Sequence, residues 1–127
     1  MKKIKYLVAG LLMMGLSAPA MAQNANYSDM LKPIEQTLKS NANIDAKGIK
    51  ELTKDYQKEF KKDPKALIAL GNSLLMNKKY DDASAIANAV IAKFKDYGDA
   101  YVLLGDIAAM KDDGGDAAMW YQQSMTM

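Results

Sequence analysis

Acidic side chains beside a pair of glycines are the first group whose types and spacing could do chemistry. Asp112 and Asp113 precede Gly114 and Gly115, and Asp116 follows them. An EF-hand calcium loop needs about 12 residues with ligands at alternating positions and a closing glutamate, and this run has neither that length nor the glutamate. A turn between helices explains it better, with the glycines at positive φ and Asp116 as the next N-cap. We therefore expect no metal site here.

Methionines are the second group with possible chemistry. Met119, Met125 and Met127 lie close together near the end of the chain, and thioether sulfur is a ligand that favours Cu(I). The chain has ten methionines but no histidine and no cysteine to complete such a ligand shell. Packing in a core or an interface is therefore the favoured role, and soft-metal handling is the less favoured alternative. No cofactor is expected.

Catalysis has little support in the sequence. Without histidine the chain can form neither a catalytic triad nor a histidine acid or base. The neighbouring carboxylates of Asp81 and Asp82 lie at a predicted helix start, where they complement the helix dipole. No glycine-rich phosphate loop is present in the sequence. We therefore expect a protein that is not an enzyme.

The first 22 residues have the three regions of a secretory signal peptide. Three lysines lie within the first five residues, an uncharged and mostly apolar run covers 6–16, and Ala20 and Ala22 form a small-x-small site. The run is shorter than the roughly 20 apolar residues that cross a membrane. The sequence predicts cleavage of 1–22 after Ala22 and an exported chain, periplasmic or secreted, without stable membrane insertion.

Removal of 1–22 changes the charge balance. The whole chain has a net charge of +2, whereas residues 23–127 hold 14 lysines against 15 acids, or −1. All basic residues are lysines, so the arginine fork that pairs with phosphate or guanine is missing. With no cysteine, disulfides and a lipid anchor on cysteine are excluded. No nucleic-acid partner is expected.

Apolar residues at spacings of three and four, together with caps and turns, predict six helices in one all-α domain over 23–127. The first opens at Ser28 or Lys32 and closes at 41–43, which places Pro33 in an early turn. The second follows Asp45 as N-cap. The third begins with Asp63 as N-cap and Pro64 at the first helical position. These helices and the next three form antiparallel pairs.

The later helices follow the same kind of signals. A turn at 77–79 precedes a fourth helix over about 80–94. Asp99 is the expected cap of the fifth helix, and Asp116 of the sixth. Residues 64–97 then recur as 98–127 at a constant spacing of 34. The recurring pairs are Ala66 and Ala100, Leu70 and Leu104, Gly71 and Gly105, Met76 and Met110, and Ala83 and Ala117. Such a period is typical of a helical solenoid.

In spacing and residue types these two units resemble the tetratricopeptide repeat (TPR). The resemblance implies a right-handed superhelix of helix hairpins, with repeat packing carried by Leu70, Gly71, Ala83, Leu104, Gly105 and Ala117. It covers 64–127 well, whereas 28–62 matches only as a hairpin and is interpreted as a degenerate first repeat or a cap. The chain departs from the family at Leu74 and Ala108, which replace a tyrosine, and at Lys95, which replaces a proline.

The resemblance also implies a concave groove for a protein or peptide partner. The corresponding residues are Lys65, Ile68, Asn72, Leu75, Met76, Asp99, Val102, Asp106, Ala109 and Met110. Some members hold a C-terminal carboxylate there with a lysine and two asparagines, but Ile68 and Leu103 stand at two of those positions. A segment making aliphatic and methionine contacts fits better. Packing of Ile68, Val102 and Met110 between the repeats is the alternative.

The last helix carries apolar side chains without a polar capping helix after it, namely Met119, Trp120 and Met125. We expect further repeats, a second copy or a docked partner to cover them. The predicted function is a non-catalytic scaffold or adaptor in the cell envelope that binds its partner through the groove. A periplasmic chaperone or assembly factor is one alternative, and methionine-based metal handling is the other.

Overall fold

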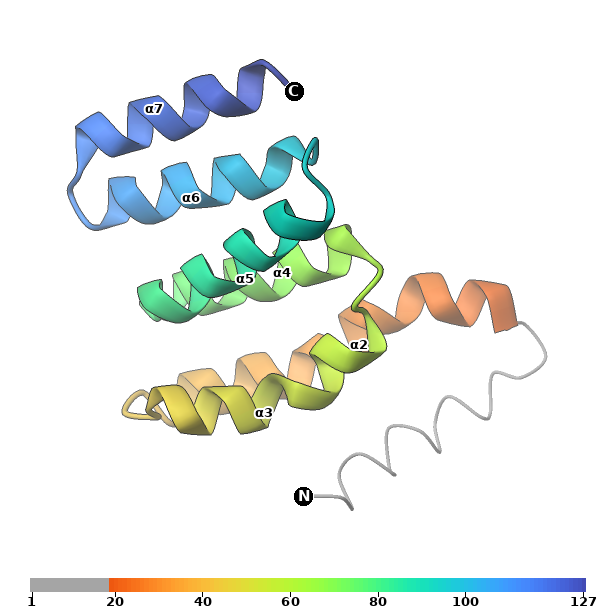
Figure 1. Cartoon of the computed structure of the whole chain (residues 1–127). Coiled ribbons are helices and arrows are strands. Elements are labelled where there is room, and N and C mark those ends of the chain that lie inside the picture. The colour runs from red at the N-terminus through yellow and green to blue at the C-terminus, as the bar shows by residue number, and fades with distance from the viewer. Residues whose placement is uncertain (1–18) are drawn as a thin grey trace.

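The computed structural model describes residues 19–127, with side chains from Tyr27 onward. This part of the chain is all-helical, with six helices and no strand, as predicted. The helices are α2 (Pro19–Ser40), α3 (Ala46–Glu59), α4 (Pro64–Met76), α5 (Tyr80–Lys93), α6 (Gly98–Met110) and α7 (Gly114–Met125). They form three successive hairpins (Figure 1). Among the described helices, none combines the length and apolarity needed to cross a membrane. The lysines and the apolar run expected of a signal peptide lie outside the described residues.

Two helix starts agree with the sequence prediction because each depends on a local side-chain cap. The Asp45 carboxylate accepts a hydrogen bond from the Gly48 N–H at 2.8 Å, at the start of α3. The Asp63 carboxylate accepts one from the Ala66 N–H at 3.2 Å, at the start of α4. Pro64 follows, where its missing N–H needs no partner.

The start of α2 differs from the prediction. This helix begins at Pro19 rather than at Ser28 or Lys32, so Ala22, the predicted cleavage position, lies in its first turn. Pro33 is therefore inside the helix and not in an early turn, and it has no N–H to donate to the carbonyl of Asp29. The alanines in the first part of α2 favour the helical state.

The starts of α6 and α7 also correct the prediction. Helix α6 begins after Tyr97 without a side-chain cap, and Asp99 lies in its first turn, where its charge complements the helix dipole. Helix α7 is capped by Asp113, whose carboxylate accepts from the Asp116 N–H at 3.2 Å. Asp116 therefore supplies the N–H that the cap accepts, and it is not itself the N-cap.

The repeat is visible in the backbone of the turns. Lys78 has a φ of 63° and Asp112 has a φ of 66°, and these residues are 34 positions apart. After each of them the chain closes the preceding helix with the same bond, Lys79 N–H to Leu74 O at 2.9 Å and Asp113 N–H to Ala108 O at 2.8 Å. A left-handed residue followed by this bond is the Schellman helix end. The described glycines all have negative φ, so the prediction of positive φ at the Asp–Gly turn was wrong.

Each hairpin packs on the next through a shared apolar core. Helix α4 contacts α5 within its own hairpin and also α2 and α6 on either side, while α5 contacts α6. Fully buried side chains come from all three hairpins and include Leu38, Leu70, Leu74, Val90 and Leu103. Polar contacts link the first two hairpins as well. The Lys79 ammonium donates to the carbonyl oxygens of Ala42 at 2.8 Å and Ile44 at 3.1 Å.

The two glycines of the repeat leave room for side chains from neighbouring helices. A Cβ at Gly71 would lie 2.5 Å from Cδ2 of Leu103 and also close to Ile86, and one at Gly105 would overlap the ring of Tyr121. Ala83 in α5 and Ala117 in α7, the small residues of the repeat on the second helix of each hairpin, are both buried. Leu103 and Ile86 therefore fill the space at Gly71, and Tyr121 fills the space at Gly105, so an added methyl group would displace them.

We expect Gly71→Ala to lower the free energy of unfolding by about 1 kcal/mol or more. Overpacking a dense core costs about 1–3 kcal/mol, which exceeds the roughly 0.5–1 kcal/mol by which alanine favours a helix over glycine. Urea denaturation followed by circular dichroism measures the difference. Gly115→Ala is the matched control, because no atom lies within 4 Å of the added Cβ. It should stabilise the protein, and a stabilising effect of both variants would contradict the packing at Gly71.

Candidate functional site

A cleft of about 430 Å³ lies between α2 and α4, the first helices of the first two hairpins. Helix α2 contributes three residues at spacings of four, which places them on one face of the helix. The other lining residues come from α4 and from Asn77, which follows it. The lining residues are Leu31, Glu35, Lys39, Ala69, Asn72, Ser73, Met76 and Asn77. A volume of this size falls within the roughly 300–1,000 Å³ of small-ligand pockets. It is also open on one side, because Asn72 and Met76 are exposed.

A carboxylate is held in place within this cleft. The buried Ser73 hydroxyl donates to Oε2 of Glu35 at 2.7 Å, which ties α4 to α2. The amide of Asn77, which also lines the cleft, donates to the Ser73 carbonyl at 2.8 Å. Because one hydroxyl occupies only part of the carboxylate, Glu35 keeps lone pairs for another donor. Leu31 and Ala69 supply apolar surface beside it. The cleft can therefore hold an apolar side chain and orient a donor or cation at Glu35.

The predicted groove residues of α4 divide between this cleft and the core. Asn72 and Met76 line the cleft, and Met76 is 75% exposed. Lys65 is exposed at the start of α4. Ile68 and Leu75 are buried, so in this arrangement they pack between helices, which is the alternative already considered for Ile68.

The predicted groove residues of α6 lie outside this cleft. Asp99, Val102, Ala109 and Met110 are exposed along α6. Asp106 is engaged with α7, because its carboxylate accepts a hydrogen bond from the Tyr121 hydroxyl at 2.7 Å. That bond also raises the pKa of the Tyr121 hydroxyl. The structure thus joins α4 positions with α2, and it leaves the α6 positions as a separate exposed surface.

Three lining residues from α2 were not among the predicted site residues. Leu31, Glu35 and Lys39 belong to the hairpin that matches the repeat least well, so no family position could be carried onto them. Their spacing of four residues places them on one helix face, and that periodicity was a usable signal. What the sequence could not show is that this face lies opposite Asn72 and Ser73.

The acidic residues and the C-terminal methionines considered as candidate metal ligands form no metal site in the described part of the chain. No three His, Cys, Asp or Glu residues there lie close enough together to hold a metal ion. At the C-terminal helix, Trp120 is half-buried against Tyr101, with ring centroids 6.2 Å apart, while Met119 and Met125 are exposed. Trp120 therefore belongs partly to the packing of α7 on α6.

Comparison with known proteins identifies no relative of this chain. No protein-family model, curated protein or solved structure matches the chain. The 34-residue repeat is itself supported by the two matching helix ends at Lys78 and Asp112.

Proposed function

We propose that this protein is a non-catalytic, TPR-like binding protein that holds a peptide segment or partner protein in the α2–α4 cleft. The observation that carries the proposal is the Glu35 carboxylate, fixed by Ser73 beside an open apolar cleft. A fixed acceptor costs little further ordering when a partner binds, which is what an orienting group in a recognition site requires.

The chemistry of the cleft defines the segment it would bind. An aliphatic side chain fits against Leu31 and Ala69, and a lysine, arginine or amide donor next to it reaches Glu35. Met76 covers the rim with a flexible and polarizable side chain that adapts to different apolar neighbours. Asn72 offers both a donor and an acceptor to the backbone of an extended segment.

The proposed setting follows from the first 22 residues. A chain exported by such a signal and cleaved after Ala22 would meet its partner in the periplasm or outside the cell. It would act there as a scaffold or adaptor. A single dominant partner supports this role, whereas recovery of many unfolded envelope proteins would favour the chaperone alternative.

Met76→Asp is expected to reduce partner recovery from an envelope extract by at least about tenfold, because it replaces the adaptable apolar contact at the rim with a hydrated carboxylate that binding of the aliphatic part of the segment would have to desolvate. Quantitative pull-down with the full chain measures the effect. Met125→Asp is the matched control, since this methionine is 80% exposed on α7 and makes the same chemical change away from the cleft. Equal recovery by wild type and Met76→Asp would falsify the cleft as the binding site.

A further inference from the structure

Helix α3 carries a row of exposed lysines along one side. They follow one another at spacings of three and four residues, which places their side chains on the same face of the helix. These residues, which we call the lysine face, are Lys47, Lys50, Lys54 and Lys58. The row extends over about 16 Å of helix length. Two more exposed lysines, Lys61 and Lys62, follow the end of α3.

The acidic residues of α3 lie beside the lysine face and not within it. They form their own row at spacings of four, turned by roughly 100° round the helix. They are Glu51, Asp55 and Glu59. Lys50 and Lys54 are therefore an i,i+4 pair of like charge, and the next lysine repeats this pairing. Such pairs destabilise a helix, and negative charge brought to the face by a partner would relieve their repulsion.

Charge is also distributed unevenly between the two ends of the chain. Residues 46–62 hold six lysines against three acids, or +3, whereas residues 98–127 hold one lysine against five acids, or −4. Near a negatively charged surface this asymmetry would turn α3 toward the surface and the last hairpin away from it.

The residue types distinguish a lipid surface from an acidic protein as the partner. The exposed large hydrophobic residues of the described chain lie on α4, on α6, on α7 or after it, and none of them is on α3. Protein interfaces depend on aromatic and arginine anchors, and lysine is depleted from their centres. Lysine is a flexible point charge that suits the diffuse charge of lipid headgroups, whereas arginine is better matched to a fixed carboxylate.

We propose that the lysine face of α3 docks this protein on a bilayer that contains anionic lipids. The contact is electrostatic and peripheral, because the face offers charge and no exposed large hydrophobic residue for insertion. None of the residues that line the α2–α4 cleft comes from α3. Helix α4 lies behind α5, on the side of the chain away from the viewer, while α3 is in front (Figure 1). The cleft therefore stays open in the docked chain, and docking through α3 does not require the function proposed for the cleft.

Binding of the full chain to vesicles tests the proposal. Phosphatidylcholine vesicles that contain about 30% phosphatidylglycerol are compared with vesicles of phosphatidylcholine alone, by co-sedimentation at low salt. The charged vesicles should bind the chain at least about tenfold more tightly. Salt at about 0.5 M should remove the difference, because it screens exposed charges. Equal binding to the two kinds of vesicle would overturn the assignment.

Two triple variants with the same change in net charge locate the contact. Lys50→Gln, Lys54→Gln and Lys58→Gln together should weaken binding to the charged vesicles at least about tenfold, since one lysine near such a surface contributes about fivefold. The control removes three exposed lysines elsewhere and should change the affinity by about twofold or less. Its substitutions are Lys32→Gln, Lys95→Gln and Lys111→Gln. Residues 1–22 are the same in both variants, so equal losses would contradict docking through α3.

Two further measurements report on the orientation and on the competing partner. Bicelles with a paramagnetic lipid headgroup should broaden the amide NMR signals of the lysine face and leave those of α7 unchanged. Soluble glycerol phosphate has the charge of the headgroup without the surface, so it should not displace the chain from vesicles. Broadening confined to other helices would overturn the proposal. Displacement by polyglutamate at the same charge concentration as the lipid would also overturn it, in favour of an acidic protein segment.

Discussion

Tyr56→Ala should lower the free energy of unfolding by about 3–5 kcal/mol, the range for removing a buried aromatic side chain. Tyr56 is 1% exposed and packs against Phe60 with ring centroids 4.8 Å apart. Its hydroxyl donates to the Ala66 carbonyl at 2.7 Å, which connects α3 to the first turn of α4. Urea denaturation followed by circular dichroism measures the loss. A loss below about 1 kcal/mol, typical of an exposed site, would contradict this packing.

Tyr56→Phe keeps the ring and removes only the hydroxyl, so it isolates the hydrogen bond, expected at about 1–3 kcal/mol. Its pH dependence gives a further check. Burial, followed by the nearby Tyr27 and acidic side chains, raises the pKa of the Tyr56 hydroxyl in the folded chain. The unfolded chain ionises first, near pH 10, so the stability that Tyr56 contributes is complete below this pH and declines above it. The difference between wild type and Tyr56→Phe should therefore shrink above about pH 10, and a constant difference would argue against a buried hydroxyl.

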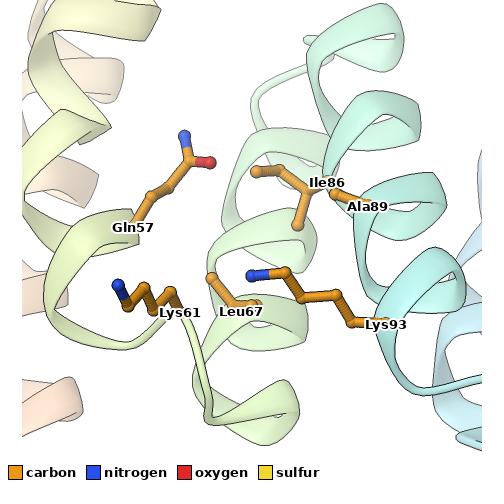
Figure 2. A pocket seen from close by; sticks show the side chains of 6 residues that line it. All are labelled: Gln57, Lys61, Leu67, Ile86, Ala89 and Lys93. Atoms are coloured by element: carbon orange, nitrogen blue, oxygen red, sulfur yellow. The ribbon is translucent and has the colours of Figure 1, made fainter.

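This contact also positions a small pocket of about 100 Å³ between α3, α4 and α5 (Figure 2). Gln57 follows Tyr56 directly and lines that pocket, and Leu67 follows Ala66 on the opposite side. Because the hydroxyl fixes the distance between α3 and α4, loss of the bond is expected to affect stability and pocket geometry together.

Leu70→Ala is expected to lower the free energy of unfolding by about 2–5 kcal/mol, through lost burial and the cavity that remains. Leu70 is 0% exposed in the middle of α4, which contacts helices of all three hairpins. The surrounding hairpins are tied to one another and can collapse only partly into the space. Urea denaturation measures the effect, and an unchanged m-value would show that the folded state keeps its compactness.

Met76→Ala on the same helix is the matched control for Leu70→Ala. Its side chain is 75% exposed, so its removal should change stability by about 0.5 kcal/mol or less. Similar effects at the two positions would contradict the description of α4 as the central helix with one face buried and one end open to the cleft.

Local signals explain the parts of the fold that sequence reasoning predicted correctly. The caps at Asp45 and Asp63 involve donors only three residues away, so their residue types were sufficient. The competing caps at Asp113 and Asp116 show the limit of the same signal. Aspartate is a favourable N-cap at either position. Asp113 becomes the cap because the preceding helix ends at Asp112, which has a left-handed backbone conformation.

The candidate sites were less accessible to sequence reasoning than the helices. Asn72 and Met76 were named from the repeat, but their partners Glu35 and Lys39 come from a hairpin that follows the repeat poorly. The small pocket between α3, α4 and α5 is lined by residues as far apart in sequence as Gln57 and Lys93, which come from different hairpins. Helix periodicity identifies a face on each element but contains no information about which faces meet.

The sequence by itself determined an all-α chain of helix hairpins, a repeat at 34 residues and the absence of histidine and cysteine chemistry. These properties arise from contacts within a few turns and from composition. Only the tertiary structure decided that Ile68 is core while Met76 is open, and that Ser73 holds Glu35. The physical reason is that burial and convergence depend on how the hairpins pack, and small differences in helix start and crossing change which side chains meet.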